Sequence, residues 1–188
     1  SIGRILDKGA KLMFCSILVL LTTFQAVKAD DSIFLVTGAT GRTGSLIYQQ
    51  LVTAGFNTRA LASSPQEAAD VLNCTQCDAS EGIYYGDVRN STSLIPALEG
   101  VSFLAIAVGV GADSTEQEMQ DVEWHGVENQ VSVLASGAAA SGRPVSSLGV
   151  ALISSMGTTD PDPAPYEGGA DLFWKLQAET FLASSAVP

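Results

Sequence analysis

The sequence has few positive charges and few side chains of the kind that bind metals. Nine Lys and Arg residues face 20 Asp and Glu residues in a chain of 188, which gives a formal net charge of −11. Nucleic acids and anionic membrane surfaces carry the same sign of charge, so neither is expected as a partner. The single histidine, His125, argues against a multi-histidine metal site or a histidine-activated nucleophile. We therefore expect no metal site.

Charged residues of both signs are also scarce, at 15% of the chain, whereas hydrophobic residues make up 46%. An intrinsically disordered chain has the opposite balance, so that class is excluded. Three cysteines are too few for a scaffold built from disulfides. The length suits one domain with a sizeable core.

The first 29 residues have the pattern of a secretory signal peptide. Arg4, Lys8 and Lys11 precede the uncharged run 12–21, and small residues stand at −3 and −1 of a cleavage point after Ala29. The run is shorter than the roughly 20 apolar residues of a membrane span. The alternatives are an uncleaved anchor and a buried N-terminal helix.

Cleavage after Ala29 would define the mature domain and its compartment. Residue 1 is not Met, so we expect the true start at Met13. The mature domain, 30–188, is then expected in the lumen of the secretory pathway or outside the cell, without membrane contact. A plastid-related compartment is the alternative if the source is an alga.

Cleavage would also remove Cys15 and leave Cys74 and Cys77 in the run Cys-Thr-Gln-Cys. In an oxidising lumen, this pair is expected to close as a disulfide. A thioredoxin-like redox motif is the alternative, but that motif needs a preceding strand, and none is expected here.

From Ser32 onward, short β-type runs alternate with helical runs, the pattern of a parallel sheet with crossover helices. Strands are expected at 32–37, 58–61, 83–85, 101–108 and 150–154. Helices are expected at 43–54, 65–72, 91–98, 119–138 and 172–182. The pattern predicts an α/β fold of the Rossmann type, a doubly wound parallel sheet in three α/β/α layers. A strand normally follows the last helix of such a fold, so we expect a truncation at the C-terminus.

The first strand runs directly into the glycine-rich loop GATGRTG, residues 38–44, which opens the first helix. The first glycine permits a tight turn, the second lets backbone N–H groups approach a pyrophosphate, and the third allows close helix–strand packing. The phosphate then lies at the positive end of the helix dipole. A purely structural turn is the alternative. The predicted dinucleotide-binding residues of this loop are Gly38, Thr40, Gly41, Arg42, Thr43 and Gly44.

The end of the second strand indicates which dinucleotide binds. An NAD site usually has an acid there to hold the ribose 2′-hydroxyl, but this chain has Ala62, Ser63 and Ser64. Arg42 can reach toward a 2′-phosphate, and the serine hydroxyls can donate to it. This favours NADP over NAD, with a simply solvated Arg42 as the alternative.

The ends of the third and fourth strands contribute further predicted cofactor-binding residues. Asp87 follows the third strand and is expected to form a hydrogen bond near the adenine, although Asp is also common at helix N-termini. The rest of this set is Val88, Ala107, Val108 and Gly109.

Four segments, in this order, resemble the atypical short-chain dehydrogenase/reductases: TGATGRTG at 37–44, GDVRNSTSL at 86–94, LISSMGT at 152–158 and FWKLQAETFL at 173–182. The run EWHGVENQ at 123–130 is similar to this family as well. The resemblance is closest to the NmrA-like plant and algal NAD(P)-binding proteins of subgroup five. It implies a Rossmann fold, NAD(P) as ligand and, in many relatives, oxidoreductase chemistry.

The resemblance also implies an active site built from a serine and a Tyr-xxx-Lys pair. Ser154 or Ser155 corresponds to the serine, and Lys175 corresponds to the lysine that donates to the nicotinamide ribose. Four residues before that lysine stands Asp171, so the tyrosine that would hand a proton to a carbonyl is missing. Tyr166, in the preceding loop, is a candidate substitute.

Two functions remain compatible with the sequence. The first is an NADP-dependent oxidoreductase that acts on a small carbonyl or quinone-like substrate. The alternative is a non-catalytic dinucleotide-binding module with a regulatory or assembly role. The fold alone does not separate these functions.

Overall fold

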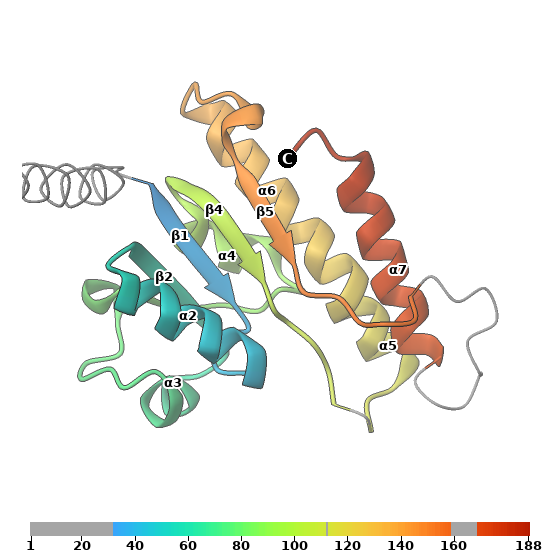
Figure 1. Cartoon of the computed structure of the whole chain (residues 1–188), viewed down its shortest axis with the longest axis horizontal. Coiled ribbons are helices and arrows are strands. Elements are labelled where there is room, and N and C mark those ends of the chain that lie inside the picture. The colour runs from blue at the N-terminus through green and yellow to red at the C-terminus, as the bar shows by residue number, and fades with distance from the viewer. Residues whose placement is uncertain (1–31, 112, 159–168) are drawn as a thin grey trace, which may run out of the picture. The chain divides into compact units, whose positions relative to one another are not determined.

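Five parallel strands form one sheet, which helices cover on both faces (Figure 1). The computed structural model describes residues 32–111, 113–158 and 169–188. The predicted signal peptide with Cys15, and Tyr166 of the proline-rich loop, lie outside the described residues. The strands are β1 (Ile33–Thr37), β2 (Asn57–Ala62), β3 (Ile83–Tyr85), β4 (Val101–Ile106) and β5 (Gly149–Leu152).

The strand order is β3-β2-β1-β4-β5, so the chain starts in the middle of the sheet. It first builds outward to β3 and then crosses over to pair β4 with the other side of β1. This order confirms the predicted doubly wound parallel sheet. It also creates a reversal point between the carboxyl ends of β1 and β4, where open α/β sheets bind ligands.

Helices lie on each face of the sheet, and the sheet separates two apolar clusters. The α-helices are α2 (Arg42–Ala54), α3 (Pro65–Val71), α4 (Ser91–Leu98), α5 (Glu116–Met119), α6 (Gly126–Ala140) and α7 (Gly169–Ser184). Helices α2 and α3 pack on one face around Val36 of β1, and α4, α6 and α7 pack on the other around Leu35. Because both faces are covered, β1 is a nearly continuous apolar run rather than an alternating one.

Most predicted elements are found within a few residues of their expected bounds. Strand β3 and helix α4 begin and end where predicted. Strand β4 ends at Ile106 instead of residue 108, and β5 ends at Leu152 instead of residue 154. The apolar pattern continues past β4 because residues 107–110 line a cavity after they leave the sheet.

The long helix expected at 119–138 has a more complex structure. It begins with α5, after a capping box between Thr115 and Glu118, and then widens into the π-helical segment η2 (Gln120–His125) before α6. A π turn inserts one extra residue and is often found at functional sites. The inserted turn carries Glu123, whose exposed fraction is only 4%.

A small disulfide loop follows α3, as predicted for Cys74 and Cys77, whose Cα atoms are 5.0 Å apart. The loop leads into the 3₁₀ turn η1 (Ala79–Glu81), and a second such turn, η3 (Val145–Ser147), precedes β5. The Glu81 carboxylate accepts hydrogen bonds from the backbone N–H groups of Thr75, Gln76 and Cys77. These bonds lower the pKa of Glu81, with the largest effect from Cys77.

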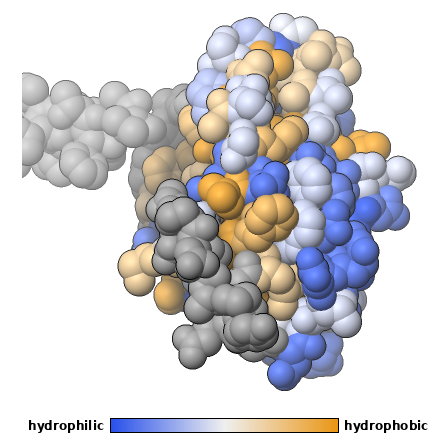
Figure 2. Space-filling view, turned by 90° about the vertical axis from the view of Figure 1, so that its right-hand side faces the viewer, coloured by the Kyte–Doolittle hydropathy of each residue, from blue (hydrophilic) through white to orange (hydrophobic). Residues whose placement is uncertain are grey.

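The outer surface of α7 is partly apolar. Phe173 on this helix is 48% exposed, and Figure 2 shows apolar surface in the middle of the corresponding side of the molecule, with hydrophilic surface beside it. Within the described residues, no helix has both the length and the apolar character needed to span a bilayer.

Candidate functional site

The glycine-rich loop makes a turn that only glycines can form. Gly38 has a φ of +66°, and a Cβ on it would lie 2.4 Å from the carbonyl oxygen of Ala107. A Cβ on Gly44 would lie 2.1 Å from the carbonyl oxygen of Gly38. The loop is therefore pressed against both α2 and the end of β4. Gly41 caps α2 without a side chain, so the first N–H groups of the helix remain available to an anion.

A cavity of about 850 Å³ opens at the carboxyl ends of β1, β2, β3 and β4, at the reversal point of the sheet. Its walls are the glycine loop and the segments that follow these strands. The lining residues are Gly38, Thr40, Gly41, Leu61, Ala62, Ser63, Glu67, Tyr85, Gly86, Asp87, Val88, Arg89, Ala107, Val108, Gly109, Val110, Ser114, Glu118 and Val122.

The structure brings most of the predicted cofactor-binding residues to this cavity. Nine of them line it: Gly38, Thr40, Gly41, Ser63, Asp87, Val88, Ala107, Val108 and Gly109. Within the described part of the chain, seven predicted site residues do not line it: Arg42, Thr43, Gly44, Ser64, Ser154, Ser155 and Lys175. Arg42 and Thr43 are exposed at the start of α2, and Gly44 is buried beneath the loop.

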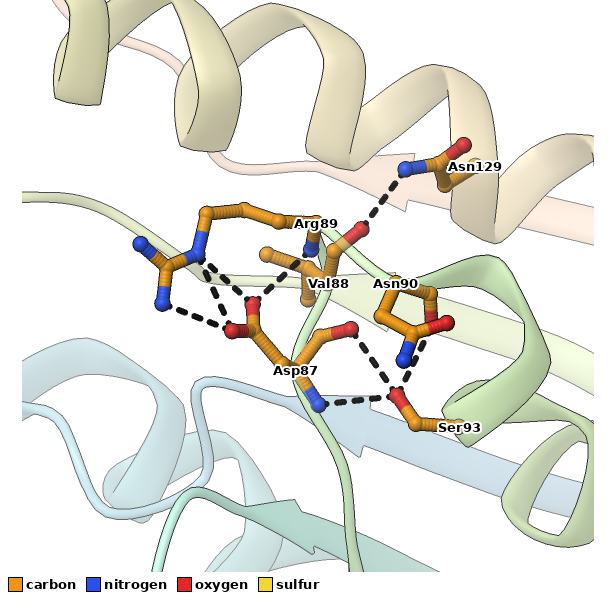
Figure 3. Close-up of polar contacts among 6 residues, drawn as sticks. All are labelled: Asp87, Val88, Arg89, Asn90, Ser93 and Asn129. Carbon is orange, nitrogen blue, oxygen red and sulfur yellow. Dashed lines mark hydrogen bonds and ion pairs between the residues drawn. The ribbon is translucent and has the colours of Figure 1, made fainter.

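Asp87 is held in place by its neighbours at the end of β3 (Figure 3). The guanidinium of Arg89 donates to both oxygens of its carboxylate, at 2.6 to 3.0 Å. These bonds lower the pKa of Asp87 below its usual value. The hydroxyl of Ser93 bonds the main chain of Asp87, and Asn129 of α6 donates to the carbonyl of Val88 at 2.9 Å. The segment is thus fixed from both α4 and α6.

Glu67, which was not among the residues predicted from the sequence, connects the end of β2 to the glycine loop through its carboxylate. Its Oε2 accepts hydrogen bonds from the hydroxyl of Ser63 and from that of Thr40, the latter at 3.3 Å. The Ser64 hydroxyl accepts the Glu67 N–H at 3.3 Å and caps α3. The two serines predicted to hold a phosphate therefore bond to Glu67 instead.

Glu123 and Lys175 form a buried ion pair behind the residues that follow β4. The Lys175 Nζ lies 2.5 Å from Glu123 Oε2, and Glu123 Oε1 accepts the Val110 N–H at 3.1 Å. Burial raises the pKa of Glu123, and the ion pair with Lys175 opposes that rise. Asp171, in the place of the family tyrosine, lies 4.0 Å from the same Nζ. The pair joins α7 to the cavity wall.

The two candidate catalytic serines follow β5. Ser154 donates its hydroxyl hydrogen bond to Glu179 of α7, and Ser155 is half-buried beside it. Lys175 lies on the same helix as Glu179, four residues earlier. Two of the predicted catalytic residues, Ser154 and Lys175, are therefore both in contact with carboxylates of this chain.

The aromatic residues of this region pack against one another. Trp174 stacks on Trp124 with a centroid distance of 5.4 Å. His125 pairs with Glu128, three residues later on the helix, at 2.9 Å.

A family model for NAD(P)H-binding proteins matches residues 38–188. This match covers most of the chain and the entire glycine loop, so the chain belongs to the NAD(P)H-binding family. It confirms the resemblance to the NmrA-like, atypical short-chain dehydrogenase/reductases.

Individual relatives are similar over most of this chain. An uncharacterized chloroplastic protein of Arabidopsis thaliana is 29% identical, over 90% of this chain and 54% of its own length. Sanguinarine reductase of Eschscholzia californica is 27% identical, over 82% of this chain and 65% of its own length. The chain thus spans roughly half to two thirds of these relatives.

Solved structures show the same fold. Carveol dehydrogenase from Mycobacterium avium, in complex with NAD, superposes with a TM-score of 0.63 at 19% identity. The superposition covers 82% of this chain and 64% of that one.

Proposed function

We propose that the protein is an NAD(P)H-dependent oxidoreductase that acts on a small carbonyl or quinone-like substrate. The observation that carries this proposal is the cavity at the reversal point of the sheet. Val110, in the segment that follows β4, lines this cavity and donates its N–H to Glu123, which pairs with Lys175. The sequence similarity to sanguinarine reductase supports reduction as the chemistry.

The residues of the cavity fit a dinucleotide. Gly38 and Gly44 leave no room for side chains and let the loop approach α2 and β4 closely. In the proposal, the backbone N–H groups of Arg42 and Thr43 face the pyrophosphate at the start of α2, whereas the Gly41 N–H bonds the Gly38 carbonyl at 2.9 Å and holds the loop. The bound dinucleotide would supply a hydride from its nicotinamide ring.

The candidate catalytic residues would act on the substrate side. Ser154 or Ser155 would hold the substrate oxygen, and Lys175 would donate to the nicotinamide ribose. Because Asp171 replaces the family tyrosine, water or the substrate itself would supply the proton. Ser154 would have to release its hydrogen bond to Glu179 to reach a substrate.

A non-catalytic dinucleotide-binding module is the second candidate. The observation that favours it is that Ser154 and Lys175 are already paired with carboxylates of this chain, Glu179 and Glu123. Such a protein would bind the dinucleotide without turnover, in a regulatory or assembly role.

A turnover measurement separates the two candidates. Loss of the nicotinamide absorbance of NADH and NADPH would be followed against a panel of quinones and aldehydes, with dinucleotide affinity measured in parallel. Lys175→Met breaks the buried pair with Glu123, so circular dichroism must first show that the variant is folded. Turnover that disappears in the folded variant supports the oxidoreductase. Tight binding without turnover on the whole panel supports the second candidate.

The choice of cofactor and the compartment are finer proposals. NADP was predicted from Arg42, Ser63 and Ser64, but Ser63 bonds the Glu67 carboxylate and Arg42 does not line the cavity, so these residues do not decide between NADP and NAD. A signal peptide over residues 1–29 remains a proposal, and the chloroplastic relative favours a plastid as the alternative to the secretory lumen. Intact-mass measurement and fractionation of protein from the native source test both.

A further inference from the structure

Glu67 occupies the part of the cavity between the glycine loop and the end of β2. Its carboxylate bonds the hydroxyls of Ser63 and Thr40, which belong to these two walls. The backbone N–H of Glu67 donates to the hydroxyl oxygen of Ser64, so Glu67 is anchored in the first turn of α3. In sheets of this order, an acid beside the second strand meets the ribose of the adenosine half.

The second carboxylate oxygen of Glu67, Oε1, is the atom that matters for a ligand. Among the described residues, both hydrogen bonds to the Glu67 carboxylate reach Oε2. Glu67 lines the cavity, and none of the hydrogen bonds described for its carboxylate uses Oε1. A ribose 2′-hydroxyl is a donor and matches this oxygen, whereas a 2′-phosphate presents only acceptors and negative charge there.

The charges around the cavity also oppose a 2′-phosphate. The described lining residues include three acids, Glu67, Asp87 and Glu118, and one cation, Arg89. The guanidinium of Arg89 is already bound to Asp87. Arg42, the cation expected to hold the phosphate, does not line the cavity. A phosphate monoester adds about −2 charge at pH 7, and this charge would lie beside the Glu67 carboxylate.

We propose that Glu67 accepts a hydrogen bond from the adenosine ribose 2′-hydroxyl and makes the protein select NAD(H) over NADP(H). This inference rests on the dinucleotide site of the proposed function and does not depend on turnover. It reverses the cofactor choice predicted from residues 62–64, because the acid reaches the site from α3 rather than from the strand end.

The test compares NADH and NADPH affinity, by nicotinamide fluorescence, in the wild-type chain, Glu67→Gln and Asp70→Asn. Asp70 is the matched control because it lies on the same helix, does not line the cavity and bonds only Gln66 in the described structure. The wild-type chain should bind NADH at least about tenfold more tightly than NADPH. Glu67→Gln should reduce this ratio by about tenfold, and Asp70→Asn should leave it within about twofold. Circular dichroism checks that each variant is folded.

The outcomes separate this inference from the function on which it rests. If neither dinucleotide binds the wild-type chain, the dinucleotide site itself is wrong. If NADPH binds as tightly as NADH or more tightly, or if Glu67→Gln and Asp70→Asn change the ratio equally, only the role of Glu67 is wrong. Arg42→Ala adds a further arm: selective weakening of NADPH would restore the NADP assignment.

Discussion

Gly41 is the glycine of the loop 38–44 at which a side chain would meet the least obstruction. A Cβ on it would lie 3.2 Å from the carbonyl oxygen of Gly38, and its φ is an ordinary −77°. Gly41→Val requires the Gly38 carbonyl to shift by a few tenths of an ångström, and its branched side chain would occupy the space where a pyrophosphate approaches the backbone. Circular dichroism checks that the variant is folded. We expect dinucleotide affinity, measured by calorimetry, to fall by more than about tenfold, or about 1.4 kcal/mol.

The control for this variant is Gly137→Val, because a Cβ on Gly137 meets nothing within 4 Å. Gly137 lies on α6, away from the cavity-lining residues, so its substitution should leave the affinity unchanged. If the folded Gly41→Val protein binds the dinucleotide with wild-type affinity, the dinucleotide does not bind at this loop.

A second prediction at the scale of single residues concerns the Glu123–Lys175 pair. Glu123→Gln keeps the size of the side chain and an acceptor for the Val110 N–H, but it leaves the Lys175 ammonium without its buried counter-charge. Removal of one partner of a buried pair should lower the free energy of unfolding by about 3–5 kcal/mol in urea titrations. Glu128→Gln breaks the more exposed pair with His125 and should cost less than about 1 kcal/mol. Equal losses in the two variants would contradict a structural role for the buried pair.

The sequence predicted the glycine loop but not the contacts of the carboxylates of Glu67 and Glu123, for a physical reason. A strand, a tight turn and a helix start are local, so residues 38–44 carry the whole signal. Glu67 meets Thr40 across 27 positions, and Glu123 meets Lys175 across 52. These contacts exist only after the helices have packed, and no local pattern distinguishes such acids from solvated ones.

The disulfide loop between α3 and β3 offers a prediction at the scale of an element. The backbone N–H groups of Cys77, Gln76 and Thr75 hold the pKa of Glu81 below its ordinary value. The unfolded chain therefore takes up this proton first as the pH falls. The stabilisation is complete above about pH 4.3 and is lost as the pH falls through the folded-state pKa.

Glu81→Gln should lower the thermal midpoint at neutral pH and flatten its fall in acid. Thermal unfolding followed by circular dichroism between neutral and acidic pH measures both effects. Glu99→Gln removes the same charge from the end of α4, where no hydrogen bond to its side chain is described, and serves as the control. Identical pH profiles for wild type and Glu81→Gln would show that the carboxylate does not hold this loop.

Element identity was predictable from periodicity, but the interruption of the long helix was not. The strands are apolar runs and the helices have apolar positions at helical spacing, so the pattern of apolar residues predicts both kinds of element. The π turn at Gln120–His125 adds one residue to a helix whose apolar spacing remains helical on either side. Glu123 lies in this turn and bonds Val110 and Lys175, which are 13 and 52 positions away in the chain. A local pattern does not record such contacts.

At the scale of the whole molecule, ligand binding should stabilise the fold, because the cavity is formed by segments that only the folded sheet brings together. A ligand that binds the folded chain alone stabilises it by about 2.7 kcal/mol at a concentration 100-fold above its Kd. For a domain of this size, each kcal/mol raises the thermal midpoint by about 2–4 °C. Saturating NADH should thus raise the midpoint by about 5–10 °C.

The same measurement on Gly41→Val separates specific binding from a general effect of an anion on an acidic protein. With a net charge of −11, the chain repels dinucleotides over long distances, and salt screens this repulsion. The comparison therefore belongs at one fixed ionic strength. NADH at the same concentration should leave the midpoint of Gly41→Val nearly unchanged, while Gly137→Val should show the full rise. A rise of equal size in Gly41→Val would mean that the stabilising site lies elsewhere on the molecule.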